Sequence, residues 1–181
     1  MTRDEALDLV KSKVSNKNLI KHMLATEAVM RRLAEHFDED IELWGLAGLL
    51  HDLDYDQTVD DFPRHGLLTA DILSEYDVDD RVVQAIKAHP GHVPAESRMD
   101  KALYAVDPLT GLIVAAALMH PSKKLRNVDT EFVANRFKEK RFAAGANRDQ
   151  IKTCNRIELD VETFIGISLK AMQEIDDQLG L

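Results

Sequence analysis

The chain has 181 residues, 45% of them apolar, enough for one domain with a hydrophobic core; its single cysteine, Cys154, excludes an intrachain disulfide and fits a reducing compartment. The longest apolar run, Leu112 to Met119, is far shorter than the roughly 20 residues of a membrane-spanning helix, and no signal-peptide segment follows Met1, so we expect a cytoplasmic protein without membrane partners. The net charge of −9 disfavours general nucleic-acid binding, because neutralising phosphates requires a basic face.

Helical patterns dominate the chain and no alternating strand pattern persists, which predicts an all-α fold. Thr2 and Glu5 have the spacing of a capping box, so a first helix should run from there to about Val14. Further helices are expected over 17–37, 41–51, 64–76, 79–89, 98–119 and 160–179, with short ones from about 129. Residues 53–63 are expected to form a polar loop, and Pro108 should kink the helix that contains it.

These elements predict a single domain over 1–181. Its core is expected at about 17–120, with 121–181 as a C-terminal helical extension packed on it. No internal repeat and no low-complexity segment divides the chain.

Charge is distributed unevenly along the sequence. Between Glu35 and Asp80 fifteen acidic residues stand against one basic residue, whereas between Lys123 and Arg156 ten basic residues stand against four acidic ones. One interpretation is that both regions are solvated helix faces and loops. The other is a carboxylate-rich metal site beside a basic surface that attracts an anionic substrate.

The adjacent pair His51 and Asp52 follows an apolar helical stretch and begins a polar loop. Any single histidine is more often structural than a ligand, but an imidazole and a carboxylate presented together at a helix end can hold one metal ion or bridge two.

Other metal-ligand candidates lie elsewhere in the chain. Asp107 lies among aliphatic residues, where a carboxylate is costly to bury unless it is paired or bound to metal, although it could also be a capping group at the kink. His22 lies early in the second helix, His65 opens a helix and His89 closes one. Such nitrogen and oxygen ligands suit Mn, Fe, Zn, Ni or Co, and leave Mg possible.

The order His22, His51-Asp52, Asp107 resembles the signature of the HD superfamily of metal-dependent phosphohydrolases, and the additional pair His65 and His89 resembles its two-metal branch. The resemblance covers about 17–119, and residues 101–111 are similar to small bacterial HD proteins. It implies an all-α HD-type bundle. The chain departs from the HDIG pattern, because residues 53–56 (Leu-Asp-Tyr-Asp) lack the Gly-Lys often found there.

The resemblance implies two divalent metal ions. His22, His51, Asp52 and Asp107 would bind the first, and Asp52 would bridge to a second that His65 and His89 complete. His92 competes with His89 for this role, but His89 ends the apolar helix and keeps the family position. His36 and His120 fall outside the pattern.

The metals would activate a hydroxide that attacks a nucleotide or another small phosphate ester. Asp52 would be catalytic as the bridging ligand. Asp56, or alternatively Asp54, is expected to relay a proton to the leaving oxygen. Contacts to the substrate phosphates are expected from a basic residue elsewhere in the chain, with these candidates: Arg64, Lys123, Lys124, Lys138 and Arg141. Asn18, Thr26 and Thr110 are expected to support the ligands.

Two alternatives remain at this stage. The same ligand set would serve a mixed-valent di-iron oxygenase, which some two-metal HD relatives are. The basic segment 123–156 would also suit a non-catalytic module that binds a nucleotide or an anionic partner. The sequence leaves the substrate, the native metal and the oligomeric state open.

Overall fold

Helices account for all the regular secondary structure in the computed structural model, which describes residues 1–181, so the prediction of an all-α fold is confirmed. The α-helices are α1 (Arg3–Lys13), α2 (Lys17–Phe37), α3 (Ile41–Leu50), α4 (Tyr55–Thr58), α5 (Leu67–Leu73), α6 (Asp80–Ala88), α7 (Arg98–Met119), α8 (Thr130–Lys138), α9 (Arg148–Lys152), α10 (Val161–Gln173) and α11 (Asp176–Leu179). The 3₁₀ helices are η1 (Phe62–Arg64), η2 (Leu125–Asn127) and η3 (Thr153–Ile157).

The long helices α2 and α7 begin and end as predicted, and the predicted capping box of Thr2 and Glu5 starts α1. Three predicted boundaries are wrong. The segment 53–63 contains α4 and part of η1 rather than only a loop. The helix expected from residue 64 begins at Leu67, because Gly66 has a φ of 75°. The final helix breaks near Ile175, after which Asp176 pairs with the Arg126 guanidinium at 2.6 Å.

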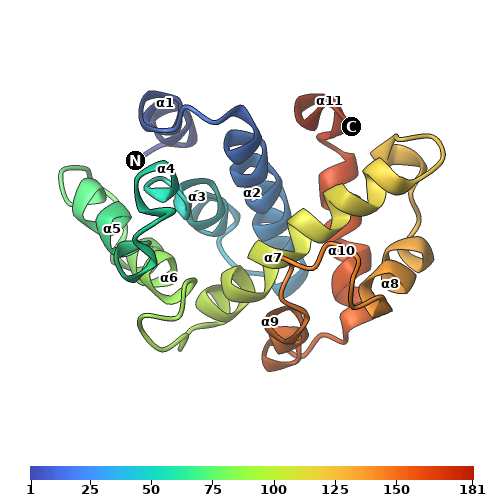
Figure 1. The fold of residues 1–181 in the computed structure, drawn as a ribbon. Coiled ribbons are helices and arrows are strands. Elements are labelled where there is room, and N and C mark those ends of the chain that lie inside the picture. Colours follow the sequence, from blue (N-terminus) through green and yellow to red (C-terminus); the bar gives the residue numbers. More distant parts are fainter.

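Helix α7 crosses the middle of the molecule (Figure 1), where it contacts α2, α3 and α6 as well as α8, α9 and α10; α10 and α11 also contact α2. By length and composition alone it could cross a membrane, but 56% of its apolar window is buried inside the protein. Its buried positions include Leu103, Val106 and Leu109, around Asp107. We therefore describe α7 as the central core helix.

Helices α2 and α3 pack closely, and this packing brings His22 and His51 together. A Cβ atom at Gly48 would lie 2.8 Å from the backbone oxygen of Thr26, so only glycine permits this approach of the two backbones. One hydrophobic cluster of 44 buried residues runs through the chain and includes Ile151, Phe164 and Met172 from the C-terminal third. The C-terminal helices thus share the core of the helices that carry the candidate ligands.

Candidate metal centre

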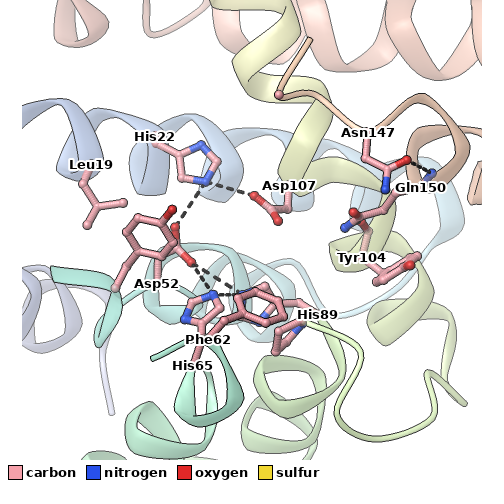
Figure 2. Close-up of a pocket in the computed structure, with 13 residues that line it drawn as sticks. Leu19, His22, Asp52, Phe62, His65, His89, Tyr104, Asp107, Asn147 and Gln150 are labelled. Atoms are coloured by element: carbon pink, nitrogen blue, oxygen red, sulfur yellow. Dashed lines mark hydrogen bonds and ion pairs between the residues drawn. The ribbon is translucent and has the colours of Figure 1, made fainter. Parts of the chain in front are cut away.

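Five of the six predicted ligand residues line one cavity of about 620 Å³ (Figure 2). They are His22, Asp52, His65, His89 and Asp107. The sixth, His51, is fully buried beside them. The structure therefore brings all six side chains to one place, although they lie up to 85 residues apart in the sequence, from position 22 to position 107.

The six residues are held mainly by long helices and by the ends of shorter ones. Their positions are His22 in α2, His51 as the C-cap of α3 with Asp52 next, His65 after η1, His89 as the C-cap of α6, and Asp107 in α7. A helix C-terminus carries a partial negative charge. The ends of α3 and α6 therefore both favour a cation at this point.

Backbone carbonyls fix the orientation of two imidazoles. The Nδ1 atom of His51 lies 2.9 Å from the Gly48 oxygen, and that of His89 lies 2.6 Å from the Ile86 oxygen. A carbonyl only accepts hydrogen bonds, so each Nδ1 carries the hydrogen and donates it. In the neutral ring each Nε2 is consequently left with a lone pair, which is the atom that binds a metal ion.

A carboxylate orients the third imidazole. His65 Nδ1 donates to Asp54 Oδ1 at 2.8 Å, while Asp54 Oδ2 accepts from the backbone N–H groups of Gly66 and Thr69 at 2.8 and 2.9 Å. Burial alone would raise the pKa of Asp54, but these hydrogen bonds outweigh it and the pKa is lowered. Asp54 is fully buried and does not line the cavity. It holds His65 in place rather than passing a proton to a leaving group.

A hydroxyl orients the fourth imidazole. Thr110 donates its hydrogen to the Asp107 carbonyl at 3.0 Å, so its oxygen accepts from His22 Nδ1, also at 3.0 Å. His22 Nε2 then presents a lone pair to the cavity as well. Thr110 therefore occupies the supporting position expected from its place one turn after Asp107.

The Nε2 atoms approach one another in pairs. His22 and His51 are separated by 3.1 Å, and His65 and His89 by 3.0 Å. Two lone pairs at this distance repel unless a proton or a metal ion lies between them. A metal bonded to two nitrogens at about 2.1 Å holds them about 3.0 Å apart at a right angle and about 3.4 Å apart at a tetrahedral angle. The spacing of the donor atoms thus fits a metal ion.

The Asp52 carboxylate lies between the two imidazole pairs. Its Oδ2 is 3.5 Å from His22 Nε2, and its Oδ1 is 3.3 Å from His65 Nε2 and 3.5 Å from His89 Nε2. Asp107 Oδ1 lies 3.2 Å from His22 Nε2 and is therefore close to only one of the two imidazole pairs. Asp52 is therefore placed to bridge two cations, whereas Asp107 is placed to serve one. Figure 2 shows the two carboxylates facing His22, Asp107 from α7 and Asp52 from the turn after α3.

The groups around the buried carboxylate of Asp52 keep it ionised. Burial would raise the pKa of Asp52, but the charge of His51 and hydrogen bonds from His65 and His89 hold it well below its usual range. Burial lowers the pKa of His89, whereas Asp52 and Asp54 overcome the effect of burial at His65 and raise its pKa to about 9. Two groups satisfy the distances expected of metal ligands: His22, His51, Asp107 and His51, Asp52, His89.

The structure does not bring Asp56 to the cavity. Its Oδ2 accepts hydrogen bonds from the backbone N–H of Ser15 at 2.8 Å, the hydroxyl of Ser15 at 3.0 Å and the N–H of Asn16 at 3.3 Å. Asp56 therefore ties α4 to the start of α2, and the expectation that it relays a proton is corrected.

None of the five candidate phosphate-binding residues lines this cavity, although Lys138 lines a neighbouring one. Arg64 is exposed and lies 3.9 Å from Asp61, and Arg141 is exposed in the segment between α8 and α9. Lys124 lies beyond the end of α7. At 1.5 Å per residue, that end is about 18 Å along the helix from Asp107. No lysine or arginine is present in the cavity lining at all. The expectation that Arg64, Lys124 or Arg141 contacts a phosphate in this cavity is corrected.

The remaining histidines lie apart from the cluster. His92 Nε2 contacts the Phe62 carbonyl at 3.2 Å, and His120 Nδ1 contacts the Ser122 hydroxyl at 2.8 Å. His36 is exposed and packs edge-on against Phe37. His89, rather than His92, is the histidine that joins the cluster.

Several cavity residues were missed from the sequence: Tyr55, Tyr104, Asn147 and Gln150. Tyr104 lies one helical turn before Asp107, so helix periodicity could have identified it. Asn147 and Gln150 belong to the C-terminal segment and carried no local signal. They reach the cavity because α9 packs against α7 (Figures 1 and 2).

Comparison with known proteins defines the class. The sequence profile described as "HD domain" matches residues 19–118, which is more than half of the chain. The chain therefore belongs to the HD domain family, which lies within the metal-dependent phosphohydrolase superfamily and whose domain implies a divalent metal. The bundle and the His/Asp cluster described above agree with that assignment.

Individual relatives are distant. The chain is 30% identical over 136 residues to ribonuclease Y of Desulfotalea psychrophila, covering 74% of this chain and 26% of the relative. It is 25% identical over 166 residues to ribonuclease Y of Sulfurovum sp., covering 90% and 33%. An uncharacterised protein of Methanocaldococcus jannaschii is 28% identical over 161 residues, covering 84% and 92%. The chain thus spans a quarter to a third of these ribonuclease Y relatives. No solved structure matches it significantly.

Proposed function

We propose that the chain is a hydrolase that cleaves a nucleotide or another small phosphate ester with the help of two bound divalent metal ions. The observation that carries this proposal is the convergence of four imidazole Nε2 atoms and two carboxylates at one end of a 620 Å³ cavity. Membership of the HD domain family supports the same chemistry.

In this proposal His22, His51, Asp52 and Asp107 hold one metal ion, while Asp52, His65 and His89 hold the other. When bound, such a pair lowers the pKa of a shared water and neutralises charge on phosphoryl oxygens. The candidate metals are Mn, Fe, Ni, Co and Zn, with Mg possible because carboxylates contribute to the site. The protein's own contribution is to fix each imidazole through its Nδ1 partner, so that no reorganisation is needed when the site is used.

The opposite part of the cavity would bind the rest of the substrate. Gln150 Nε2 is engaged by the Tyr104 carbonyl at 2.8 Å, and Asn147 Oδ1 accepts from the backbone of α9, which leaves the Gln150 oxygen and the Asn147 amino group for a substrate. Tyr104 adds aromatic surface there, whereas the Tyr55 ring packs against His65 at the candidate metal centre. This lining suits an uncharged polar group such as a base or a sugar.

The domain assignment belongs to the same proposal. We treat 1–181 as one HD-type domain in which the segment 121–181 completes the cavity by supplying Gly145, Asn147 and Gln150. The shared hydrophobic core supports this assignment.

The test is phosphate release from a panel of nucleotides and simple phosphate esters with added Mn²⁺. We expect Mn²⁺-dependent release by the wild type and none from a His51→Ala, Asp52→Ala variant. His92→Ala is the matched control, because it removes a nearby histidine that lies outside the cluster, and it should retain activity.

Absence of release with every compound would contradict the proposal. Oxygen uptake by iron-loaded protein would then favour the di-iron oxygenase, and a nucleotide-induced rise in melting temperature without turnover would favour a binding module.

A further inference from the structure

The cavity that contains the candidate metal centre has no lysine or arginine in its lining, yet a basic cavity adjoins it. This second cavity, of about 830 Å³, is lined by residues of the α8–α9 region, including Lys138, Lys140, Arg148 and Lys152. It shares Gly145 and Asn147 with the metal-centre cavity, so the two lie on either side of the same short stretch of backbone.

The charge of the basic cavity is only partly neutralised. Lys152 pairs with the exposed Asp149 at 3.0 Å, and Glu139 is engaged by Arg136 at 3.1 Å. Lys138 and Lys140 are in no ion pair of the structure, and Asp149 is the only acidic side chain in the lining. The cavity is therefore a local excess of positive charge on a protein whose net charge is −9.

Arg148 fixes the stretch of backbone around Gly145 and Asn147 through hydrogen bonds to carbonyl oxygens and not through an ion pair. Its guanidinium donates to the carbonyl oxygens of Phe137, Glu139, Phe142, Ala143 and Ala146. These bonds fix the loop 139–147 and with it the residues common to both cavities. The charge of Arg148 is not cancelled by a carboxylate, so it adds to the potential of the basic cavity.

We propose that the basic cavity lined by Lys138, Lys140, Arg148 and Lys152 binds a second phosphate group of the substrate, one that is not cleaved. This inference rests on the proposed function, because it assumes that the scissile phosphate lies at the candidate metal centre. The substrate would then carry at least two phosphates and cross Gly145 and Asn147 between the two cavities. A substrate with a single phosphate would leave the basic cavity empty.

Binding to metal-free protein tests the inference independently of turnover. Chelation removes the cations that would hold phosphate at the candidate metal centre, where the Asp52 and Asp107 carboxylates remain, so phosphate binding then reports on the basic cavity. We would titrate chelator-treated protein with the dinucleotide pApA, with ADP and with adenosine, and follow backbone amide resonances by NMR. We expect shifts confined to 138–152 with pApA or ADP and none with adenosine.

A Lys138→Ala, Lys140→Ala variant should lose these shifts. Lys123→Ala, Lys124→Ala is the matched control, since both lysines lie in the basic segment but outside both cavities, and it should retain them. Shifts with pApA alone would identify a phosphodiester chain, and shifts with ADP alone a phosphoanhydride chain. No shift with either, or shifts that persist in the Lys138→Ala, Lys140→Ala variant, would overturn the inference.

Kinetics separates this inference from the proposed function. If turnover is found, the Lys138→Ala, Lys140→Ala variant should raise KM about tenfold for a two-phosphate substrate, with kcat and the KM for p-nitrophenyl phosphate unchanged. A failure of the proposed function would appear as no turnover of either compound. A failure of the inference alone would appear as equal KM values for wild type and variant.

Discussion

Two aspartates of the same short segment illustrate how position decides the role of a residue. Asp54 and Asp56 are two residues apart, but Asp54 is fully buried against His65 whereas Asp56 lies near the surface and accepts hydrogen bonds from Ser15 and Asn16. The sequence favoured Asp56 as a proton relay, with Asp54 as the alternative, and did not indicate that Asp54 is buried. Their partners come from distant parts of the chain, so only the folded structure separates them.

Asp54→Asn should weaken Mn²⁺ binding by 10- to 100-fold, because an amide cannot accept all the hydrogen bonds that orient His65. Asp56→Asn should leave Mn²⁺ affinity unchanged and alter the unfolding free energy by less than about 1 kcal/mol, since it loses only part of a capping interaction. Isothermal titration with Mn²⁺ and urea unfolding measure the two effects. Equal Mn²⁺ affinities for the two variants would contradict the assignment of Asp54.

The raised pKa of His65 predicts that metal binding depends on pH. Hydrogen bonds to Asp52 and Asp54 outweigh its burial and raise the pKa to about 9, so at neutral pH the metal-free protein carries a proton on this imidazole. A metal ion must displace that proton, and Mn²⁺ affinity should therefore rise with pH up to about 9 and then level off. Titration at several pH values checks this trend, and a flat profile would contradict it.

The raised pKa of His65 also affects the stability of the metal-free protein. Because the folded pKa lies above the ordinary value of 6.5, protonated His65 stabilises the fold fully at and below that pH. This contribution is lost as the pH rises through about 9. Metal binding replaces the proton with a larger positive charge.

At the scale of elements, a proline in α7 accounts for a contact between this helix, which carries Asp107, and the C-terminal segment. Pro108 has no N–H and cannot donate to the Tyr104 carbonyl one turn earlier. Gln150 donates to that carbonyl instead, at 2.8 Å, which fixes α9 against α7 beside the cavity. A residue that interrupts the hydrogen bonding of α7 therefore creates the attachment point for part of the cavity wall.

A double-mutant cycle tests this attachment. Gln150→Ala should lower the unfolding free energy by about 1 kcal/mol in the wild type, because the Tyr104 carbonyl loses its donor. In a Pro108→Ala background the backbone N–H of residue 108 can serve Tyr104, so the same change should cost clearly less. Urea unfolding of chelator-treated protein measures both values. Equal costs in the two backgrounds would contradict the proposed compensation.

The predictability of elements from the sequence follows from where their determinants lie. Helices α2 and α7 were predicted to the residue because apolar periodicity and the polar residues at their ends are local signals. The end of the last long helix was wrong because the break involves Asp176, which pairs with Arg126 fifty residues earlier. Likewise, the order of histidines and aspartates predicted the cluster, whereas Asn147 and Gln150 could not be predicted, because the contact of α9 with α7 is tertiary.

At the scale of the whole molecule, the uneven charge along the sequence becomes a spatial separation. The helices and loops around His22, Asp52 and Asp107 form an anionic centre that attracts cations, and the C-terminal segment forms a basic cavity next to it. Arg126 forms ion pairs with Asp176 and Asp177 and Arg136 with Glu139, as in the first interpretation of the charge pattern, whereas Lys138 and Lys140 form none, as the second interpretation requires. The fold thus places opposite charges on the two sides of the segment that contains Gly145.

The metal content of the protein tests the central claim most directly. We would load wild-type protein and a His65→Ala, His89→Ala variant with Mn²⁺, remove unbound metal, and determine the metal per chain by elemental analysis. The structure predicts two equivalents in the wild type and one in the variant, because His22, His51, Asp52 and Asp107 remain in place. A wild type that retains no metal, or a variant that retains as much as the wild type, would contradict the assignment of these six residues to a two-metal centre.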